Sequence, residues 1–306
     1  MTSPTLELRD VRKTYGDVAA VRGVTFEVPA GTIFGLLGPN GAGKTTTIRM
    51  IMDIIAPDSG EVLVFGHRRT REDLRRIGYL PEERGLYRKM TVIDQLVYLG
   101  ELRGLKRRES LPRIVDWLER VDLAAWGKRK IEELSKGMQQ KVQLVGTVLH
   151  EPDLLVLDEP FTGLDPINQS LFRDLLLDYR RRGKTVVLST HGMLLAEKLC
   201  DHICLISAGE VVLAGELRAI RRRLGGNAYR LRVANPQQLD LDRLAEVPGI
   251  ERAVTEDSMV KLLLAPDVDG GRVLRELVGF LDVEEFRSEE PDLEEIFIKA
   301  VSGAAV

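Results

Sequence analysis

Eight consecutive residues near the start of the chain fit the pattern G-x-x-x-x-G-K-[ST]. An apolar run at residues 33–37 precedes them and a helix-like run at 46–52 follows, so the pattern lies between a predicted strand and a predicted helix. Glycines let backbone N–H groups close around phosphate oxygens, and the helix N-terminus adds its positive dipole end. The sequence therefore predicts a site for ATP phosphates, formed by Gly38, Pro39, Asn40, Gly41, Ala42, Gly43, Lys44, Thr45 and Thr46.

The acidic pair Asp158-Glu159 follows another apolar run, at residues 154–157. Lys44 is predicted to reach the β- and γ-phosphates, while Thr45 and Asp158 are predicted to hold Mg²⁺. Glu159 is the candidate base, because water needs orientation and partial deprotonation as the γ-phosphoryl leaves. Alone, such a pair is more often a solvated turn. The phosphate loop upstream favours the catalytic interpretation.

Length and composition exclude several classes of protein. The chain has 306 residues, and at roughly 150 residues per domain this predicts two domains. A net charge of −3 and a pI near 6.0 argue against a dedicated nucleic-acid binder, so no nucleic-acid partner is expected. No apolar run approaches the ~20 residues that cross a bilayer, and residues 1–10 lack a signal-peptide core. We expect that the chain does not enter a membrane by itself.

Two cysteines, Cys200 and Cys204, are too few for a disulfide framework and favour a reducing cytoplasm. His202 lies between them, which permits an interpretation as part of a metal site. Two more ligands at a familiar spacing are missing, so we favour small buried residues.

The first two hundred residues predict a phosphate-loop NTPase core of the α/β class. Apolar runs at 33–37, 154–157 and 185–189 predict buried strands, and turns that could carry chemistry follow them. Alternating segments at 6–8 and 24–28 predict an antiparallel β subdomain. Residues 84–150 lack strong strand signals and predict a helical insertion, with Leu96, Leu99 and Leu102 on one helix face.

A basic run and a glycine turn at 221–227 predict the boundary between an ATPase domain at 1–220 and an accessory domain at 221–306. The accessory domain is predicted to be a small α+β unit of ferredoxin-like kind. Strands are expected at 229–233, 260–264 and 283–286, and helices at 239–245, 271–280 and 293–300. Asp292 followed by Glu295 predicts the N-cap of the last helix.

The segment Leu134-Ser135-Lys136-Gly137-Met138-Gln139-Gln140 resembles the L-S-G-G-Q signature of ABC ATPases. By itself, Ser-x-Gly before an amphipathic stretch is also an ordinary helix N-cap. Further segments resemble elements of the family in its order: Tyr15 as the adenine-stacking aromatic, residues 161–165 as the loop after the catalytic glutamate, and Ser189-Thr190-His191 as the switch histidine. The resemblance covers residues 5–220.

The resemblance implies a partner subunit as well as a site. In ABC ATPases two nucleotide-binding subunits, identical or different, meet head to tail around ATP. It implies that Ser135 and the Gly137 N–H contact the γ-phosphate held by the other subunit, which a helix N-terminus favours on dipole grounds. Asp165 would lie at the seam, and His191 would contact the γ-phosphate and position the water.

The sequence departs from the family pattern at three positions. Glu82 follows the run at 77–81 where the family usually carries glutamine, and Lys136 and Met138 replace a glycine and a glutamine of the signature. Glu82 can ligate Mg²⁺ as an anion, yet it adds negative charge beside the γ-phosphate. Our hypothesis is that Glu82 takes part in catalysis and links the nucleotide state, with altered Mg²⁺ dependence, to the membrane subunit that the resemblance implies as a partner.

Transport through a separate integral membrane permease is the function that the resemblance implies, with the ATPase peripheral on the cytoplasmic face of the membrane. Residues 291–297 resemble the end of ATPase subunits in sodium- and drug-efflux systems, which favours export; a domain that only stabilises or dimerises is the plain alternative. Residues 83–97 are the expected permease-docking surface, with Tyr87 and Met90 as candidate contacts.

Two rival functions stay open at this point. One is a soluble ABC ATPase acting on a ribosome or nucleic-acid complex, although such proteins carry two ATPase units or long heptad coils that this chain lacks. The other is a phosphate-loop kinase or monomeric NTPase, which the signature and His191 disfavour.

Overall fold

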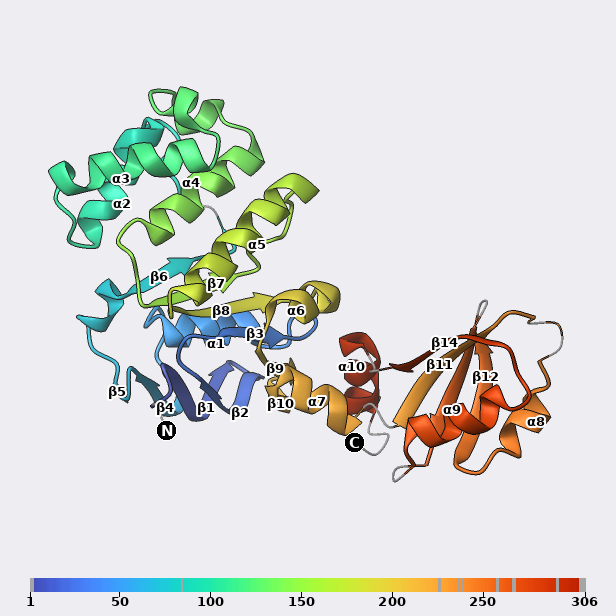
Figure 1. The fold of residues 1–306 in the computed structure, drawn as a ribbon. Helices are drawn as coiled ribbons and strands as arrows, with labels where there is room; N and C mark the ends of the chain where they lie inside the picture. The colour runs from blue at the N-terminus through green and yellow to red at the C-terminus, as the bar shows by residue number, and fades with distance from the viewer. Residues whose placement is uncertain are drawn as a thin grey trace. The chain divides into compact units, whose positions relative to one another are not determined.

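The computed structural model describes residues 3–83, 85–224, 227–235, 237, 239–256, 259–265, 268–289 and 292–302. The chain divides into two compact units, Met1–Glu216 and Leu217–Val306 (Figure 1). Each unit has its own buried core. No helix in the described ranges is long and apolar enough to span a bilayer.

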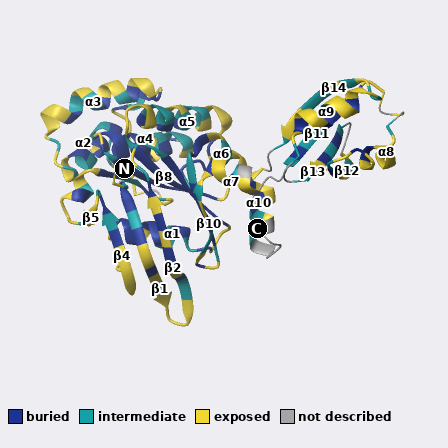
Figure 2. Ribbon diagram, turned by 60° about the horizontal axis from the view of Figure 1, so that its bottom comes forward, coloured by how far each residue is buried: buried dark blue, intermediate teal, exposed yellow. Residues whose placement is uncertain are grey.

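A six-stranded sheet forms the centre of the first unit, in the order β10-β9-β3-β8-β7-β6. Its strands are β3 (Ile33–Leu37), β6 (Ile77–Leu80), β7 (Leu154–Asp158), β8 (Thr185–Thr190), β9 (His202–Ser207) and β10 (Glu210–Glu216). All neighbours are parallel except β9 and β10. The three predicted strands are confirmed, and β3, β7 and β8 are buried along their whole length. Of these strands, β8 is labelled in Figure 2, where buried residues are dark blue.

A second, antiparallel sheet in the order β2-β1-β4-β5 confirms the predicted β subdomain. It consists of β1 (Leu6–Tyr15), β2 (Val18–Val28), β4 (Ser59–Val64) and β5 (His67–Arg68). The Phe26 ring of β2 stacks on the Phe34 ring of β3, with ring centroids 5.1 Å apart. Helix α1 (Lys44–Ile51) adds Ile48 and Ile51 to the same core. The core therefore fixes the start of α1 beside the end of β3.

The helical insertion is confirmed as α2 (Val92–Leu102), α3 (Arg107–Arg120) and α4 (Lys136–Val148), with short 3₁₀ turns at Ala124–Trp126 and Ile131–Glu133; another 3₁₀ turn, Asp73–Arg75, precedes β6. Leu96 is fully buried in its core, but Leu102 is 61% exposed. Leu102 ends α2 and lines the same cavity as Leu99, so these two side chains share a face as the sequence predicts. Helices α5 (Pro166–Arg181) and α6 (Met193–Leu199) complete the unit.

The second unit has a four-stranded antiparallel sheet in the order β12-β13-β11-β14. Along the chain its elements are α7 (Leu217–Leu224), β11 (Asn227–Val233), α8 (Leu241–Ala245), β12 (Ile250–Glu256), β13 (Met259–Leu264), α9 (Gly270–Val278), β14 (Val283–Glu289) and α10 (Leu293–Ser302). The order β11-α8-β12-β13-α9-β14 is the ferredoxin-like arrangement that the sequence predicts. The domain boundary predicted at residue 220 falls inside α7.

Strand β12 is absent from the sequence prediction. It lies at the edge of the sheet and reads I-E-R-A-V-T-E, so charged residues interrupt its apolar alternation. The predicted cap of the last helix is confirmed, since Asp292 Oδ1 accepts the N–H of Glu295 at 2.7 Å.

Candidate functional site

The phosphate loop joins the end of β3 to the start of α1, and its backbone admits only glycine at two positions. Gly38 has φ 150°, and a Cβ there would lie 2.1 Å from the carbonyl oxygen of Ile206. Gly43, which precedes α1, has φ 105°, and its Cβ would lie 2.5 Å from the carbonyl oxygen of Ala20. The loop is thus pressed between β9 and the β1-β2 hairpin, with the N-terminal amides of α1 left for an anion.

The buried side chain of Lys44 hydrogen-bonds to the backbone of the phosphate loop. Its side chain is only 6% exposed, and Nζ donates to the carbonyl oxygens of Gly38 at 2.8 Å and Pro39 at 3.1 Å. The same nitrogen lies 3.6 Å from Glu159 Oε1. The ammonium therefore lies between the loop and the candidate base, where a phosphate oxygen can replace the carbonyl acceptors.

Asp158 ends β7 and meets two hydroxyl groups. Ser189 Oγ donates to Asp158 Oδ1 at 2.5 Å, and Thr45 Oγ1 lies 3.3 Å from the same oxygen. Burial raises the pKa of Asp158, against the effect of these hydroxyl hydrogen bonds. The hydroxyl of Thr45 and the carboxylate of Asp158 are hard oxygen donors, the set that Mg²⁺ prefers. These two residues fit a magnesium site.

Glu159 is held in an unusual backbone conformation at the centre of the site. Its φ of 47° is rare for a residue with a side chain, and its N–H donates to Ser189 Oγ at 2.9 Å. His191 Nδ1 lies 3.1 Å from both carboxylate oxygens, and Thr162 Oγ1 donates to Oε2 at 3.4 Å. The arrangement fixes a carboxylate, with an imidazole beside it, next to Lys44.

Two cavities meet at Glu82 and Glu159. One, of about 320 Å³, is lined by Ala20, Asn40, Gly41, Gly43, Lys44, Thr45, Thr46, Glu82 and Glu159. The other, of about 420 Å³, is lined by Leu80, Pro81, Glu82, Lys136, Gln140, Gln143, Asp158, Glu159, Pro160, Thr162 and Gly163. The structure therefore brings Glu82 from the end of β6 to the phosphate loop and the acidic pair, as the sequence predicts.

The signature residues gather apart from the phosphate loop, where α4 and α5 begin. Ser135 caps α4 by accepting the Met138 N–H at 3.3 Å, and Asp165 caps α5 by accepting the Asn168 N–H at 2.9 Å. A Cβ on Gly137 would lie 3.4 Å from Asn168 Nδ2, so the two helix starts are neighbours. Ser135, Gly137 and Asp165 are not among the described residues that line the phosphate-loop cavity of the same chain.

Tyr15 also lies outside that lining. It ends β1, is 47% exposed, and has Lys13 Nζ 5.7 Å from its ring centroid. The opposite strand of the same hairpin brings Ala20 to the cavity wall. The Tyr15 ring is open to solvent in the single chain.

Sequence reasoning did not predict the contacts of three polar side chains that organise the site. Ser189 lies beside Asp158 because β7 and β8 pair in parallel with these two residues as partners. Gln140 Nε2 donates to the Pro160 carbonyl at 2.9 Å, and Gln143 Nε2 lies 3.3 Å from the carbonyls of both Pro81 and Glu83. For Gln140 and Gln143, the available signal was the polar character of buried positions on α4.

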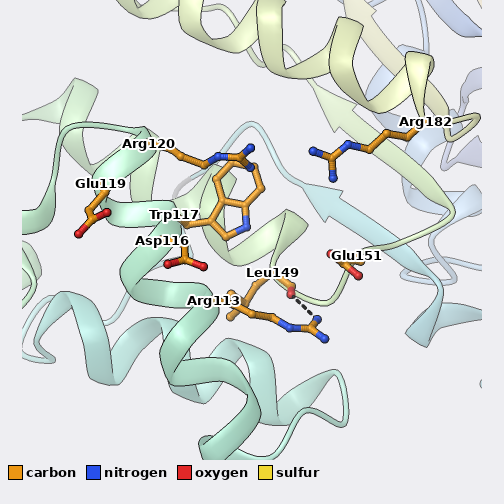
Figure 3. Close-up of a pocket in the computed structure, with 8 residues that line it drawn as sticks. All are labelled: Arg113, Asp116, Trp117, Glu119, Arg120, Leu149, Glu151 and Arg182. Atoms are coloured by element: carbon orange, nitrogen blue, oxygen red, sulfur yellow. Dashed lines mark hydrogen bonds between the residues drawn. The ribbon is translucent and has the colours of Figure 1, made fainter.

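A cavity of about 530 Å³ between α3 and the end of α5 carries mixed charge (Figure 3). Its lining is Arg113, Asp116, Trp117, Glu119, Arg120, Leu149, Glu151 and Arg182. Three arginines and three carboxylates are among these residues, and Arg120 lies 5.1 Å from the Trp117 ring centroid. The balanced charge gives this cavity no preference for polyphosphate.

The two cysteines of β9 and its approach, Cys200 and Cys204, are buried free thiols whose pKa values are raised by burial. No cluster of three metal-binding side chains occurs in the part of the chain that the structure describes.

Known proteins share both units of this chain. A sequence model of the ABC transporter family matches residues 21–162, and one of the C-terminal domain of DrrA1-3-like ATP-binding proteins matches residues 215–301. A solved structure of an ATP-binding subunit of an ABC transporter is 34% identical and has a TM-score of 0.68, covering 72% of this chain and 93% of that chain.

Three curated relatives extend the similarity. The ABC transporter ATP-binding protein YhaQ of Bacillus subtilis is 40% identical, with 97% of this chain and 98% of the relative covered. The linearmycin resistance ATP-binding protein LnrL of the same species is 31% identical, over 96% and 97%. Nod factor export ATP-binding protein I of Rhizobium sp. strain N33 is 37% identical, over 78% and 80%. With this similarity along almost its whole length, the chain belongs to the ATP-binding subunits of ABC transporters, which bind ATP and hydrolyse it to power transport.

Proposed function

We propose that this subunit drives export through a separate integral membrane permease of the sodium- and drug-efflux type. The observation that carries the proposal is the second unit, a ferredoxin-like fold whose sequence matches the DrrA1-3-like C-terminal domain. Relatives named for Nod factor export and linearmycin resistance support the same direction of transport. The ATPase domain spans residues 1–220, the accessory domain residues 221–306, and the protein lies on the cytoplasmic face of the membrane.

In the proposed hydrolysis, water attacks the γ-phosphorus, the bond to the bridging oxygen breaks, and the leaving ADP keeps the electron pair. Glu159 takes the proton of the water, and His191, at 3.1 Å, orients the carboxylate and contacts the γ-phosphate. Lys44 neutralises charge on the β- and γ-phosphates. Thr45, Asp158 and Glu82 hold Mg²⁺, which neutralises further charge on the phosphates when bound.

The active unit is proposed to be a pair of nucleotide-binding subunits that sandwich ATP, as two copies or with a different partner. The starts of α4 and α5 carry Ser135, Gly137 and Asp165 to one exposed region, beside the exposed Ile167. These residues complete the site of the second subunit, since they lie outside the phosphate-loop cavity of their own. Tyr15 stacks on the adenine from the exposed hairpin.

The permease is proposed to dock at residues 83–97. This segment borders a groove of about 360 Å³, the docking groove, lined by Tyr79, Pro81, Gly85, Leu86, Leu99, Leu102, Arg103, Gln143, Gly146 and Thr147. Tyr87 is 56% exposed and packs edge-on against Tyr98. Tyr87 and Met90 are the candidate contacts at the rim.

Coexpression with a multi-span membrane protein, sought in the neighbouring reading frames, tests the proposal. We expect the two to copurify, Tyr87→Asp and Met90→Asp to abolish copurification, and inside-out vesicles with the complex to accumulate a lipophilic cation when ATP is added. Sedimentation of the subunit with ribosomes or DNA, without copurification, would instead favour the nucleic-acid alternative. Copurification without accumulation would contradict export of that probe class.

A further inference from the structure

Helix α4 carries a polar stripe on a buried face. Lys136, Gln140, Gln143 and Thr147 follow one another at i, i+4, i+7 and i+11, so they share one side of the helix. All but Lys136 are buried. Buried polar side chains are costly unless they are hydrogen-bonded, and a helix packed on this side could have used apolar residues. The hydrogen-bond acceptors of these side chains therefore show which segments of the chain the stripe positions.

The stripe donates to the backbone of both loops that carry the predicted catalytic carboxylates. Gln140 Nε2 donates to Pro160, the residue after Glu159, at 2.9 Å. Gln143 Nε2 lies 3.3 Å from the carbonyls of Pro81 and Glu83, the two residues on either side of Glu82. An amide NH₂ has two hydrogens, so Gln143 can direct one to each carbonyl. Its contacts thus fix the chain immediately before and after Glu82.

Gln143 also lies between two cavities. It lines the cavity of about 420 Å³ with Glu82 and Glu159, and it lines the docking groove with Leu86 and Leu99. Pro81, one of its two acceptors, lines both cavities too. A displacement of residues 81–83 from either side must therefore stretch or break the bonds to Gln143.

We propose that Gln143 is a positioning residue that links the docking groove to Glu82. With both bonds made, the Glu82 segment moves as one body with α4, so nucleotide at the phosphate loop changes the groove and an occupant of the groove changes the placement of Glu82. Its transport role rests on the proposed docking of a permease there. The link itself is a property of the isolated chain.

A fluorescent probe on the groove rim tests the link without a permease. Tyr87→Cys supplies an exposed thiol for an environment-sensitive maleimide dye, while Cys200 and Cys204 are buried and have raised thiol pKa values, so they react poorly. The nonhydrolysable analogue AMP-PNP with Mg²⁺ is titrated into the labelled full-length chain. We expect a saturable change in fluorescence.

Gln143→Met keeps the length of the side chain and removes both donors. We expect it to reduce the amplitude of the change at saturating AMP-PNP at least about fivefold, the size set by losing a buried hydrogen bond. Gln143→Glu should behave in the same way, because a carboxylate accepts but does not donate. It provides a second test if the methionine variant folds poorly.

Thr147→Val is the matched control. It removes the one hydroxyl of the stripe, which lies 2.9 Å from the backbone carbonyl of Gln143 and 3.3 Å from that of Tyr79; residue 147 lines the groove, and its hydroxyl bonds to neither residue flanking Glu82. We expect it to retain the amplitude. The inference is overturned if the parent chain shows no change, if both Gln143 variants keep the full change, or if Thr147→Val loses as much. Failure to copurify with a permease would refute the proposed docking and leave this result intact.

Discussion

The two walls of the nucleotide site are built in different ways. The loop wall, Gly38 to Thr46, comes from consecutive residues and is fixed by backbone contacts that leave no room for a Cβ at Gly38 or Gly43. The helix wall, made by Glu82, Lys136, Gln140 and Gln143, joins segments about 60 residues apart through side-chain bonds to carbonyls. A wall made of backbone is rigid, whereas a wall held by a few hydrogen bonds can shift. Binding of phosphate belongs to the first wall and adjustment to the second.

The largest effect is expected where the walls meet, at Glu159. Glu159→Gln removes the proposed base and keeps the shape of the side chain, so kcat for ATP hydrolysis should fall about 10²- to 10⁴-fold, the usual contribution of general-base catalysis. Both walls stay intact, so ATP affinity, measured by displacement of a fluorescent nucleotide, should be retained. The same variant should dimerise when ATP is added, as seen by size-exclusion chromatography with light scattering. A variant that hydrolyses ATP at the parent rate, or stays monomeric, contradicts the mechanism.

In the loop wall, the loss of ATP affinity on substitution should depend on whether the added Cβ has room. A Cβ at residue 38 would lie 2.1 Å from the Ile206 carbonyl, so Gly38→Ala must displace the loop or β9. We expect ATP affinity to fall about 100-fold, corresponding to roughly 3 kcal/mol of strain and lost phosphate contacts.

Gly41→Ala is its matched control within the same loop. Gly41 also has positive φ, 79°, but a Cβ there meets nothing within 4 Å. The substitution should therefore add only backbone strain of about 1 kcal/mol, which lowers the affinity for ATP roughly fivefold. Equal affinities for the two variants would show that the contact with Ile206, and with it the rigidity assigned to the loop wall, has no role in nucleotide binding.

The hydroxyl of Ser189 holds Asp158 and Glu159 where the two walls meet, and a substitution of Ser189 tests this connection. Its hydroxyl donates to Asp158 and accepts the Glu159 N–H, and the residue is fully buried. Ser189→Ala should lower the free energy of unfolding by about 1–3 kcal/mol, the cost of leaving buried polar groups unpaired. Since Glu159 then loses one of its supports, we also expect kcat to fall about tenfold. Denaturant unfolding and steady-state ATPase assays measure the two changes, and a stability equal to that of the parent would contradict the role given to this hydroxyl.

The same contrast explains what the sequence could predict. Gly38 to Thr45 act through their order along the chain, and the fully buried strands β3, β7 and β8 appear as continuous apolar runs, so both are readable locally. Ser189 and Gln143 act through partners brought together by strand pairing and helix packing, which a single sequence does not display. Strand β12 was not predicted because an edge strand needs no continuous apolar run, and charged residues interrupt its alternation.

The smallest effect is expected on the helix wall, from Glu82→Gln. The change removes one of three carboxylates that share a cavity and replaces an anionic oxygen by an amide, which binds Mg²⁺ more weakly but repels the γ-phosphate less. Because these effects oppose each other, kcat should change by no more than about threefold, while the Mg²⁺ concentration for half-maximal ATPase should rise about two- to fivefold. Glu83→Gln is the matched control: the neighbouring glutamate is exposed and lines neither cavity, so its variant should titrate with Mg²⁺ like the parent. Identical Mg²⁺ titrations for both variants would remove Glu82 from the metal site, and a large loss of ATP affinity would show that the helix wall binds phosphate as the loop wall does.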